Sequence, residues 1–234
     1  MADVRELLAR LNPANVKFDT GRGGLPELTN QDIAGALAFI PAGLGREVLM
    51  ACYWPDGARL SQRKLLDGVA KIVRPEVMRQ SRELSEAHLD LQMVNAAIAF
   101  SGGHITQTQR MERESKERRL AWVRGLTWPK NIGDHLPFLT LAIVGELASG
   151  HLCATCEGRR EILDGATVKI CPSCKGTGRC SAPDLQRARA LDIDARAFVR
   201  LWKPAYEWLL VRMGDELHAA EREFARALSR SEVA

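Results

Sequence analysis

The sequence predicts a mainly α-helical protein: a helical bundle with a small four-cysteine zinc loop, built as a β-hairpin, inserted in a helix-turn-helix. Three observations lead to this fold class. Apolar residues recur at helical spacings of three and four along most of the 234 residues. Val and Ile do not cluster into alternating runs, and aromatic residues make up only 6% of the chain, which disfavours a large sheet. Two Cys-x-x-Cys pairs indicate a metal site.

The composition indicates a globular protein and excludes several classes. Hydrophobic residues make up 46% and charged residues 26% of the chain, ordinary values for a soluble domain. No stretch approaches the roughly 20 apolar residues that a membrane span needs. Residues 1–6 carry acidic side chains and lack the basic start and apolar core of a secretory signal. We therefore expect a cytoplasmic protein without a membrane partner.

The N-terminal half is expected to hold a flexible arm and a series of helices. Residues 1–27 contain a short amphipathic piece followed by proline and a glycine cluster, a pattern typical of a weakly ordered arm. Residues 28–137 then form an N-terminal helical region. Its first helix begins at Thr29, whose hydroxyl can cap it, with Asp32 near its positive end. This helix stops before Pro41.

Two further helices follow in this region. The second is predicted over residues 44–53, and it ends at the Trp-Pro-Asp-Gly turn of residues 54–57. The third begins after Ser61 and carries apolar residues on one face. We expect it to end near Pro75, because proline interrupts the hydrogen bonds of a helix.

The middle of the chain is predicted to be helical as well. The helical pattern covers residues 76–119, with a break at Gly102–Gly103. Within it, the run 110–119 mixes both signs of charge at short spacing, which is typical of a solvated helix face. Trp128–Pro129 and Pro137 indicate loops.

The C-terminal half is divided into two segments. Residues 138–204 are predicted to form the zinc-interrupted helix-turn-helix, in which an apolar helix over 138–147 leads into the first cysteine pair and another helix spans about 183–191. Residues 205–234 form a long amphipathic helix that packs on the body. Its apolar stripe indicates either core or a partner helix. The stripe consists of Tyr206, Leu210, Met213, Leu217, Ala220 and Phe224.

Four cysteines are spaced as the ligands of one metal ion. Cys153 and Cys156 are separated by two residues, as are Cys171 and Cys174, and 14 residues lie between the two pairs. Two intervening residues let both sulfurs of a pair reach one ion from a tight turn, so that two pairs supply a tetrahedral zinc site. Four thiolates leave no open position for water. The predicted cofactor is therefore one structural zinc ion.

The segment between the pairs is predicted to be a small β-hairpin around Asp164–Gly165, a strong turn signal. Two nearby residues are weaker ligand candidates. Cys180 has no paired cysteine and is interpreted as a spare thiol, and His151 as a capping or exposed histidine. Cys52 lies on an apolar helix face and is expected in the core.

Residues 188–201 have the arrangement of a helix-turn-helix. Small Ala188 permits close helix crossing, Leu191 and Phe198 can lock the two helices together, and Asp194 can cap the second helix. Arginines presented by that helix can reach guanine in the major groove or hold phosphate. Because helical hairpins that never touch DNA share this pattern, the prediction also depends on charge.

Positive charge is concentrated in the same part of the chain. From residue 159 to residue 203 there are ten basic residues against five acidic ones, an excess larger than the net charge of +4 of the whole chain. Such a concentration is expected for phosphate contact, although a solvated basic surface gives the same count. The candidate DNA-binding residues are Arg187, Ala195, Arg196, Val199, Arg200, Lys203, Arg159, Arg160, Lys175 and Arg179.

Three stretches occur in a distinctive order. They are the segment from Leu28 to Gln62, the two Cys-x-x-Cys-x-Gly units, and Trp202–Tyr206 followed by the terminal helix. In this order they resemble the zinc-containing late-gene antitermination proteins of lambdoid phages, the Q family. The cysteine units alone are unspecific, because DnaJ-type chaperones also contain them. The chain departs from the family by a longer middle, roughly 76–137, whose role the resemblance leaves open.

The resemblance implies a phage transcription antitermination factor that acts in the cytoplasm of the bacterial host. Such a factor binds a double-stranded DNA element at the late promoter, engages a paused RNA polymerase that still holds its sigma factor, and makes the enzyme read through terminators. The resemblance also implies that the zinc loop interrupts the helix-turn-helix, with 138–147 as the leading helix. It implies no small-molecule substrate.

Two other functions fit part of the pattern. One is a zinc-containing DNA-binding regulator that lacks antitermination activity. The other is a DnaJ-like zinc chaperone module, which is disfavoured because the chain has no His-Pro-Asp tripeptide and only two cysteine units. An enzyme is not expected, since the ligand set is closed and no Gly-rich phosphate loop or Ser-His-Asp spacing is present. The DNA target, the oligomeric state and the surface that meets polymerase stay open.

Overall fold

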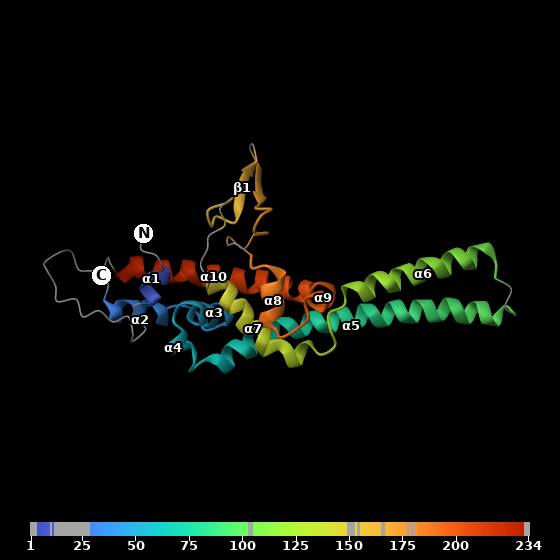
Figure 1. Ribbon diagram of the computed structural model, residues 1–234, viewed down its shortest axis with the longest axis horizontal. Coiled ribbons are helices and arrows are strands. Elements are labelled where there is room, and N and C mark those ends of the chain that lie inside the picture. The colour runs from blue at the N-terminus through green and yellow to red at the C-terminus, as the bar shows by residue number, and fades with distance from the viewer. Residues whose placement is uncertain are drawn as a thin grey trace. The chain divides into compact units, whose positions relative to one another are not determined.

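The computed structural model describes residues 4–9, 11, 29–102, 105–148, 153, 155–164, 167–176, 178 and 181–231. It is mainly helical with one two-stranded sheet, which confirms the predicted class at this level (Figure 1). The chain divides into two compact units, Met1–Val69 with Asp134–Ala234, and Ala70–Gly133. Among the described residues, no helix combines the length and the apolar character that a bilayer crossing requires.

The first unit begins with short helices whose ends are set by local chemistry. Helix α1 (Val4–Ala9) contacts α3 and α10 and buries Leu7 and Leu8, so the described part of the predicted arm is helical, while residues 12–28 lie outside the description. Helix α2 (Asn30–Ala38) starts at a capping box. The Thr29 hydroxyl accepts from the Asp32 amide at 3.2 Å, and the Asp32 carboxylate accepts from the Thr29 amide at 2.8 Å. The predicted start of this helix is confirmed.

Helix α3 (Leu44–Tyr53) has the predicted bounds, and the predicted turn after it is one turn of helix, α4 (Pro55–Ala58). The long terminal helix α10 (Lys203–Ser231) packs closely on α3 and α2. Gly45 permits this approach, because a Cβ at that position would lie 2.7 Å from the Glu216 carbonyl oxygen. The apolar stripe predicted on α10 is buried throughout. It therefore forms core within the first unit.

Two prolines lie inside helices where the sequence predicted a helix end or a loop. Helix α5 (Gln62–Phe100) continues through Pro75, and helix α7 (Ile132–Ala148) contains Pro137. Both predictions are wrong. Each proline removes a single amide donor from the helix. Around Pro75, which is exposed, the flanking Val73 is buried and keeps the helix packed, so the lost hydrogen bond is outweighed.

The second unit is a helical hairpin. The part of α5 within this unit and helix α6 (Gln107–Leu126) lie side by side (Figure 1), and the Asp90 carboxylate of α5 accepts a hydrogen bond from Lys116 Nζ of α6 at 3.0 Å. The break between the helices falls at the predicted position. Four of the buried residues of α5 are spaced seven positions apart, as in a coiled coil. They are Val73, Gln80, Ala87 and Val94.

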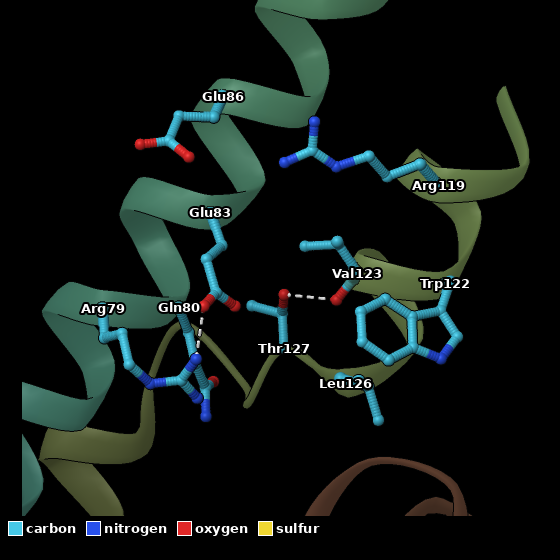
Figure 2. Close-up of a pocket in the computed structure, with 9 residues that line it drawn as sticks. All are labelled: Arg79, Gln80, Glu83, Glu86, Arg119, Trp122, Val123, Leu126 and Thr127. Carbon is cyan, nitrogen blue, oxygen red and sulfur yellow. Dashed lines mark hydrogen bonds and ion pairs between the residues drawn. The ribbon is translucent and has the colours of Figure 1, made fainter. Parts of the chain in front are cut away.

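One polar side chain fixes the open end of this hairpin. Gln80 is buried, and its Oε1 accepts from the Trp128 amide at 2.9 Å while its Nε2 donates to Glu76 Oε1 at 2.8 Å. The Thr127 hydroxyl closes the end of α6 by donating to the Val123 carbonyl at 2.8 Å (Figure 2). A buried amide without hydrogen-bond partners costs free energy, so the bond from the Trp128 amide to Gln80 holds the segment after α6 against α5.

The remaining elements follow the cysteine region. Helix α8 (Asp184–Ala190) is joined by a short turn to α9 (Ala195–Ala197), which continues without a break through the π-helical turn η2 (Phe198–Trp202) into α10. The Asp194 carboxylate caps α9 by accepting from the Arg196 amide at 2.9 Å and the Ala197 amide at 3.1 Å, as predicted. Because α9, η2 and α10 follow one another directly, the helix after the turn runs from Ala195 to Ser231 and is far longer than an isolated recognition helix.

Candidate metal centre

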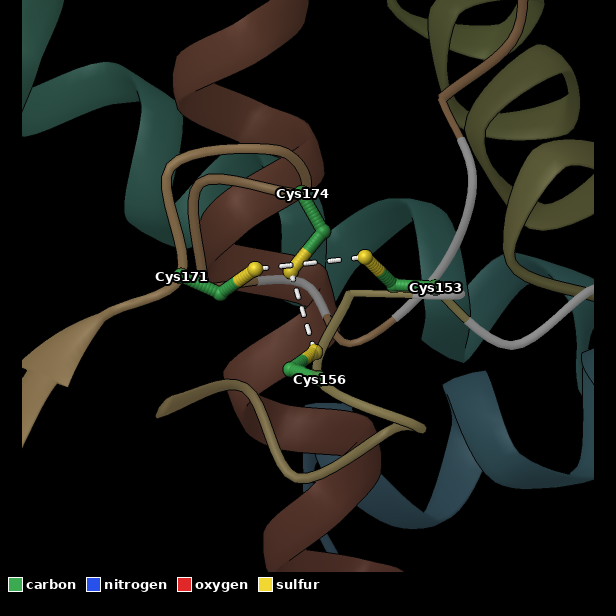
Figure 3. A group of neighbouring side chains, drawn as sticks. All are labelled: Cys153, Cys156, Cys171 and Cys174. Carbon is green, nitrogen blue, oxygen red and sulfur yellow. Dashed lines mark hydrogen bonds between the residues drawn. The ribbon is translucent and has the colours of Figure 1, made fainter. Parts of the chain in front are cut away.

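The structure brings the four predicted cysteines together. Their Sγ atoms all lie within 4.8 Å of one another, and all four side chains are buried (Figure 3). Cys153 Sγ lies 3.9 Å from Cys171 Sγ, and Cys156 Sγ lies 3.6 Å from Cys174 Sγ. These distances are too long for disulfides, in which the sulfurs are about 2.05 Å apart. Ligands about 2.3 Å from one tetrahedral zinc ion stand about 3.8 Å from one another, so this thiol set fits a metal ion.

The two Cys-x-x-Cys turns have the same backbone conformation. After the first pair, Glu157 and Gly158 have φ angles of 52° and 84°, and after the second, Lys175 and Gly176 repeat the same two values. The left-handed region disfavours side chains such as those of Glu157 and Lys175, while glycine enters it without strain. The repeated pair of left-handed residues turns each segment around a common centre.

Gly178 ties the two turns together, a role that the sequence analysis did not predict. Its amide donates to Cys174 Sγ at 3.3 Å, and its carbonyl accepts from the Cys153 amide at 3.0 Å. Its φ is 74°, and a Cβ at this position would lie only 2.8 Å from the Gly158 carbonyl oxygen. Only glycine fits this close approach without a shift of the backbone.

The backbone also favours ionised thiols. The amide of Cys156 lowers the pKa of the Cys153 thiol to about 6, and the amide of Cys174 lowers the pKa of the Cys171 thiol. Burial acts in the opposite direction on the Cys156 thiol and raises its pKa to about 11. Since the thiolate is the form that binds a metal, one readily ionised sulfur in each pair favours binding of the first ligands.

A β-hairpin connects the two pairs, as predicted. Strand β1 (Glu161–Asp164) pairs antiparallel with β2 (Thr167–Ile170), with Glu161 opposite Ile170 and Asp164 opposite Thr167. The predicted turn residue Gly165 lies outside the described residues. Ile162 of β1 packs against the cluster of four cysteines and adds an apolar side chain to it.

The helices on either side of the cysteine region are joined by a buried carboxylate. Glu146 of α7 accepts hydrogen bonds from Arg187 Nε of α8 at 2.9 Å, from the Tyr206 hydroxyl of α10 at 2.9 Å and from the Ala182 amide at 3.1 Å. The side chains of Glu146 and Arg187 are only 7% and 4% exposed. Burial and the neighbouring Glu146 raise the pKa of Tyr206, so its hydroxyl stays a donor.

This network corrects one predicted DNA contact. Arg187 was a candidate because it lies in the basic segment, but its guanidinium is buried against Glu146 and lies 4.9 Å from the centre of the Tyr206 ring. Burial disfavours the charged guanidinium and lowers the pKa of Arg187. The hydrogen bond and the negative charge of Glu146 act in the opposite direction, and the pKa of Arg187 is raised as a result. Arg187 therefore holds helices together, and its charge does not face solvent. A basic residue on a short helix gives no sequence signal that separates these two roles.

Three other basic candidates connect the cysteine region or α8 to α10. Arg160 donates to the Asp215 carboxylate at 3.0 Å and to the Gly214 carbonyl at 2.7 Å, and is partly buried. Lys175 pairs with Glu207 at 3.2 Å. The predicted contact residue Lys203 pairs with Asp184 at 2.7 Å. Each of these three basic side chains therefore forms an ion pair with an acidic residue of α8 or α10.

The remaining candidates differ in exposure. Arg159 is exposed and pairs with Glu157 at 2.9 Å. Arg196, Val199 and Arg200 are exposed on the turn of helix that follows the Asp194 cap, while Ala195 is half-buried. Among the described residues, neither Arg196 nor Arg200 forms an ion pair. Arg179 lies outside the described residues.

The weaker ligand candidates stay untested. Cys180 and His151 lie outside the described part of the chain. Cys52, expected in the core, is half-buried, with its Sγ 3.8 Å from the Val144 carbonyl oxygen of α7. It therefore belongs to the contact between α3 and α7 and not to the cysteine cluster.

Comparison of the chain with models of known protein families, with curated proteins and with solved structures found no match. The class that the fold itself defines is a helical protein with a buried four-cysteine centre suited to a metal ion.

Proposed function

We propose that this chain is a zinc-stabilised DNA-binding protein that acts in transcription antitermination. The observation that carries the first part is the four-sulfur cluster, in which Sγ separations of 3.9 and 3.6 Å lie on either side of the value of about 3.8 Å for tetrahedral zinc. Thiolates select soft or borderline metals, and zinc is the usual ion in a site of four cysteines. The closed set of ligands supports a structural role.

The zinc loop is proposed to interrupt a pair of packed helices. Helix α7 leads into the cysteine region and α8 follows it, and the Glu146–Arg187 ion pair joins the two across the insertion. Arg160 and Lys175 extend from the two cysteine turns to acidic residues of α10. The metal thus fixes a loop in which, among the described residues, Ile162 is the apolar side chain packed against the cysteines, and the loop is anchored to α10 at two points.

The DNA-binding surface is proposed at the start of the helix that follows α8. Asp194 caps this helix, and Phe198, which is fully buried, fixes its first turns against the core. Arg196 and Arg200 stand four residues apart, with Val199 exposed between them, so their side chains share one face. Two arginines that no carboxylate of the described chain neutralises can reach phosphates or guanine edges.

Replacing these arginines is expected to weaken DNA binding. Arg196→Ala or Arg200→Ala should each lower affinity by about 1–3 kcal/mol if the side chain reads a base, and loss of a phosphate contact should also reduce the salt dependence by about one unit of slope. Titration of the chain with the DNA upstream of its own late promoter, at several salt concentrations, measures both quantities. The matched control is Arg63→Ala, an exposed arginine of α5 outside the basic segment. Binding by the Arg196/Arg200 double variant that equals the control would remove this surface from the proposal.

The antitermination activity is proposed from the resemblance of the three sequence stretches to the Q family. It is tested by transcription in vitro from the chain's own late promoter through a terminator, with and without the protein. Readthrough that depends on both the protein and its promoter DNA is the expected result. Specific DNA binding without readthrough would instead indicate a regulator that does not travel with polymerase. Absence of DNA binding, with suppression of the aggregation of unfolded proteins, would favour the chaperone module.

A further inference from the structure

The helical hairpin of the second unit carries a groove along one flank. The groove has a volume of about 510 Å³, and Figure 2 shows Trp122 and Leu126 of α6 facing it from one side and Arg79, Glu83 and Glu86 of α5 lining the other. Trp122 is 66% exposed and Leu126 50% exposed. Large apolar side chains left open on a groove mark an interaction surface.

The same flank continues toward the far end of α5. Arg79 and Glu86 stand seven residues apart in the groove, and Met93 and Phe100 continue this spacing. Since the buried seam of α5 also repeats every seven residues, positions seven apart keep the same orientation to α6. Met93 is 66% and Phe100 93% exposed. The flank therefore carries two apolar patches, the base patch (Trp122 and Leu126) and the tip patch (Met93 and Phe100).

The hairpin's own core is too small to account for these side chains. Its buried cluster consists of Ala87, Leu120 and Val123, with Leu84 and Leu91 packed against it at partial burial, and Val94 and Ile98 are buried nearer the tip. A hairpin of two helices has one seam, and stable helical bundles bury apolar positions against further helices. The large apolar residues that are exposed in this unit are Met78, Leu89, Met93, Phe100, Ile105, Met111, Trp122 and Leu126.

We propose that this flank pairs with the same flank of a second copy of the chain, so that two hairpins form an antiparallel four-helix bundle. The two patches lie at opposite ends of the flank, and a two-fold rotation therefore brings the base patch of each copy onto the tip patch of the other. In this arrangement Trp122 contacts the second copy's Phe100. In the groove the four charged side chains, Arg79, Glu83, Glu86 and Arg119, balance in sign. Farther along α5, Asp90 is neutralised by its ion pairs with Lys116 and Arg119, so like faces meet without net repulsion at these positions.

The size of the flank is adequate for such a dimer. The line from Arg79 to Phe100 spans 21 residues, which is about 31 Å of helix at about 1.5 Å per residue. Two helices of about 10 Å diameter make a face of about 600 Å² per copy, or about 1,200 Å² in total. This lies at the lower end of stable, specific protein interfaces. A dimer that dissociates on dilution is therefore expected.

The proposal is tested by sedimentation equilibrium of the full chain over a dilution series. The wild-type chain should show a monomer–dimer equilibrium, and Trp122→Arg or Phe100→Glu should each raise its dissociation constant by about thirtyfold or more, as for an aromatic hot-spot residue. Both side chains are mostly exposed in one chain, so these changes leave the hairpin's own packing intact. The matched control is Met78→Arg, because Met78 is also 66% exposed on α5 but adjoins Arg79 in sequence and so does not share a face with Arg79 and Glu86.

A mixture of the two variants gives the sharper result. In a mixed dimer, the arginine at 122 of one chain faces the glutamate at 100 of the other, and the second contact keeps native Trp122 and Phe100. Mixing Trp122→Arg with Phe100→Glu should therefore restore dimers that neither variant forms alone. A wild-type chain that stays monomeric throughout, dimers that survive both substitutions, or a mixture that stays monomeric would each overturn the proposal.

Discussion

Glu146→Ala is expected to lower the free energy of unfolding by about 3–5 kcal/mol, the cost of leaving a buried charge without its partner. The Glu146 carboxylate accepts from Arg187, Tyr206 and the Ala182 amide, and its side chain is 7% exposed. Removing it leaves the Arg187 guanidinium, which is 4% exposed, without its hydrogen-bonded carboxylate and with only the longer ion pairs to Asp184 and Glu207, both at 3.9 Å. Equilibrium denaturation followed by far-ultraviolet circular dichroism measures the change.

A surface ion pair supplies the matched control. Glu223→Ala removes the exposed partner of Arg226 on α10, a pair for which about 0–1 kcal/mol is expected. If Glu146→Ala were no more destabilising than Glu223→Ala, the carboxylate would not join α7, α8 and α10. A double variant, Glu146→Ala with Arg187→Met, should recover part of the loss, because it removes the stranded charge as well.

Cys171→Ser is expected to release the metal and unfold the cysteine loop while the helices stay folded. Three thiolates no longer close the coordination sphere, and the loop has little apolar core besides Ile162. The helices persist because the Glu146–Arg187 pair and the packing of α10 on α3 do not involve the metal. Metal analysis, limited proteolysis between α7 and α8, and circular dichroism together measure the three parts of this result.

The control for this variant is Cys52→Ser. Cys52 lies outside the cysteine cluster, so its replacement should leave both the metal content and the protection of the loop unchanged. Retention of one metal equivalent by the Cys171→Ser chain would show that the ligand set is wrong. Loss of the helical signal along with the metal would show that the loop is needed for the whole fold.

The features that the sequence predicted well are those with short-range causes. The cap at Thr29 depends on Asp32 three residues away, and the antiparallel hairpin depends on its turn residues. The cysteine cluster follows from ligand spacing, which restricts the chain to one tight turn per pair. Such features are readable because the interacting residues are neighbours in the chain.

The features that the sequence predicted poorly depend on distant residues. Pro75 and Pro137 lie within helices because tertiary packing outweighs one missing hydrogen bond. The helix propensity of the local sequence does not include that packing. Arg187 looked like a DNA contact because its partner Glu146 lies 41 positions away. The role of Gly178 as a link between the two cysteine turns likewise needs the three-dimensional approach of Gly158.

X-ray absorption at the zinc edge of the purified full-length chain tests the metal centre most directly, since both the ion and its ligands are read in one spectrum. The proposed zinc site, built on the cluster of four cysteines, predicts one zinc ion per chain with four sulfur ligands at about 2.3 Å. A folded, DNA-binding chain that contains no zinc, or a zinc shell in which nitrogen or oxygen replaces sulfur, would contradict the assignment of Cys153, Cys156, Cys171 and Cys174.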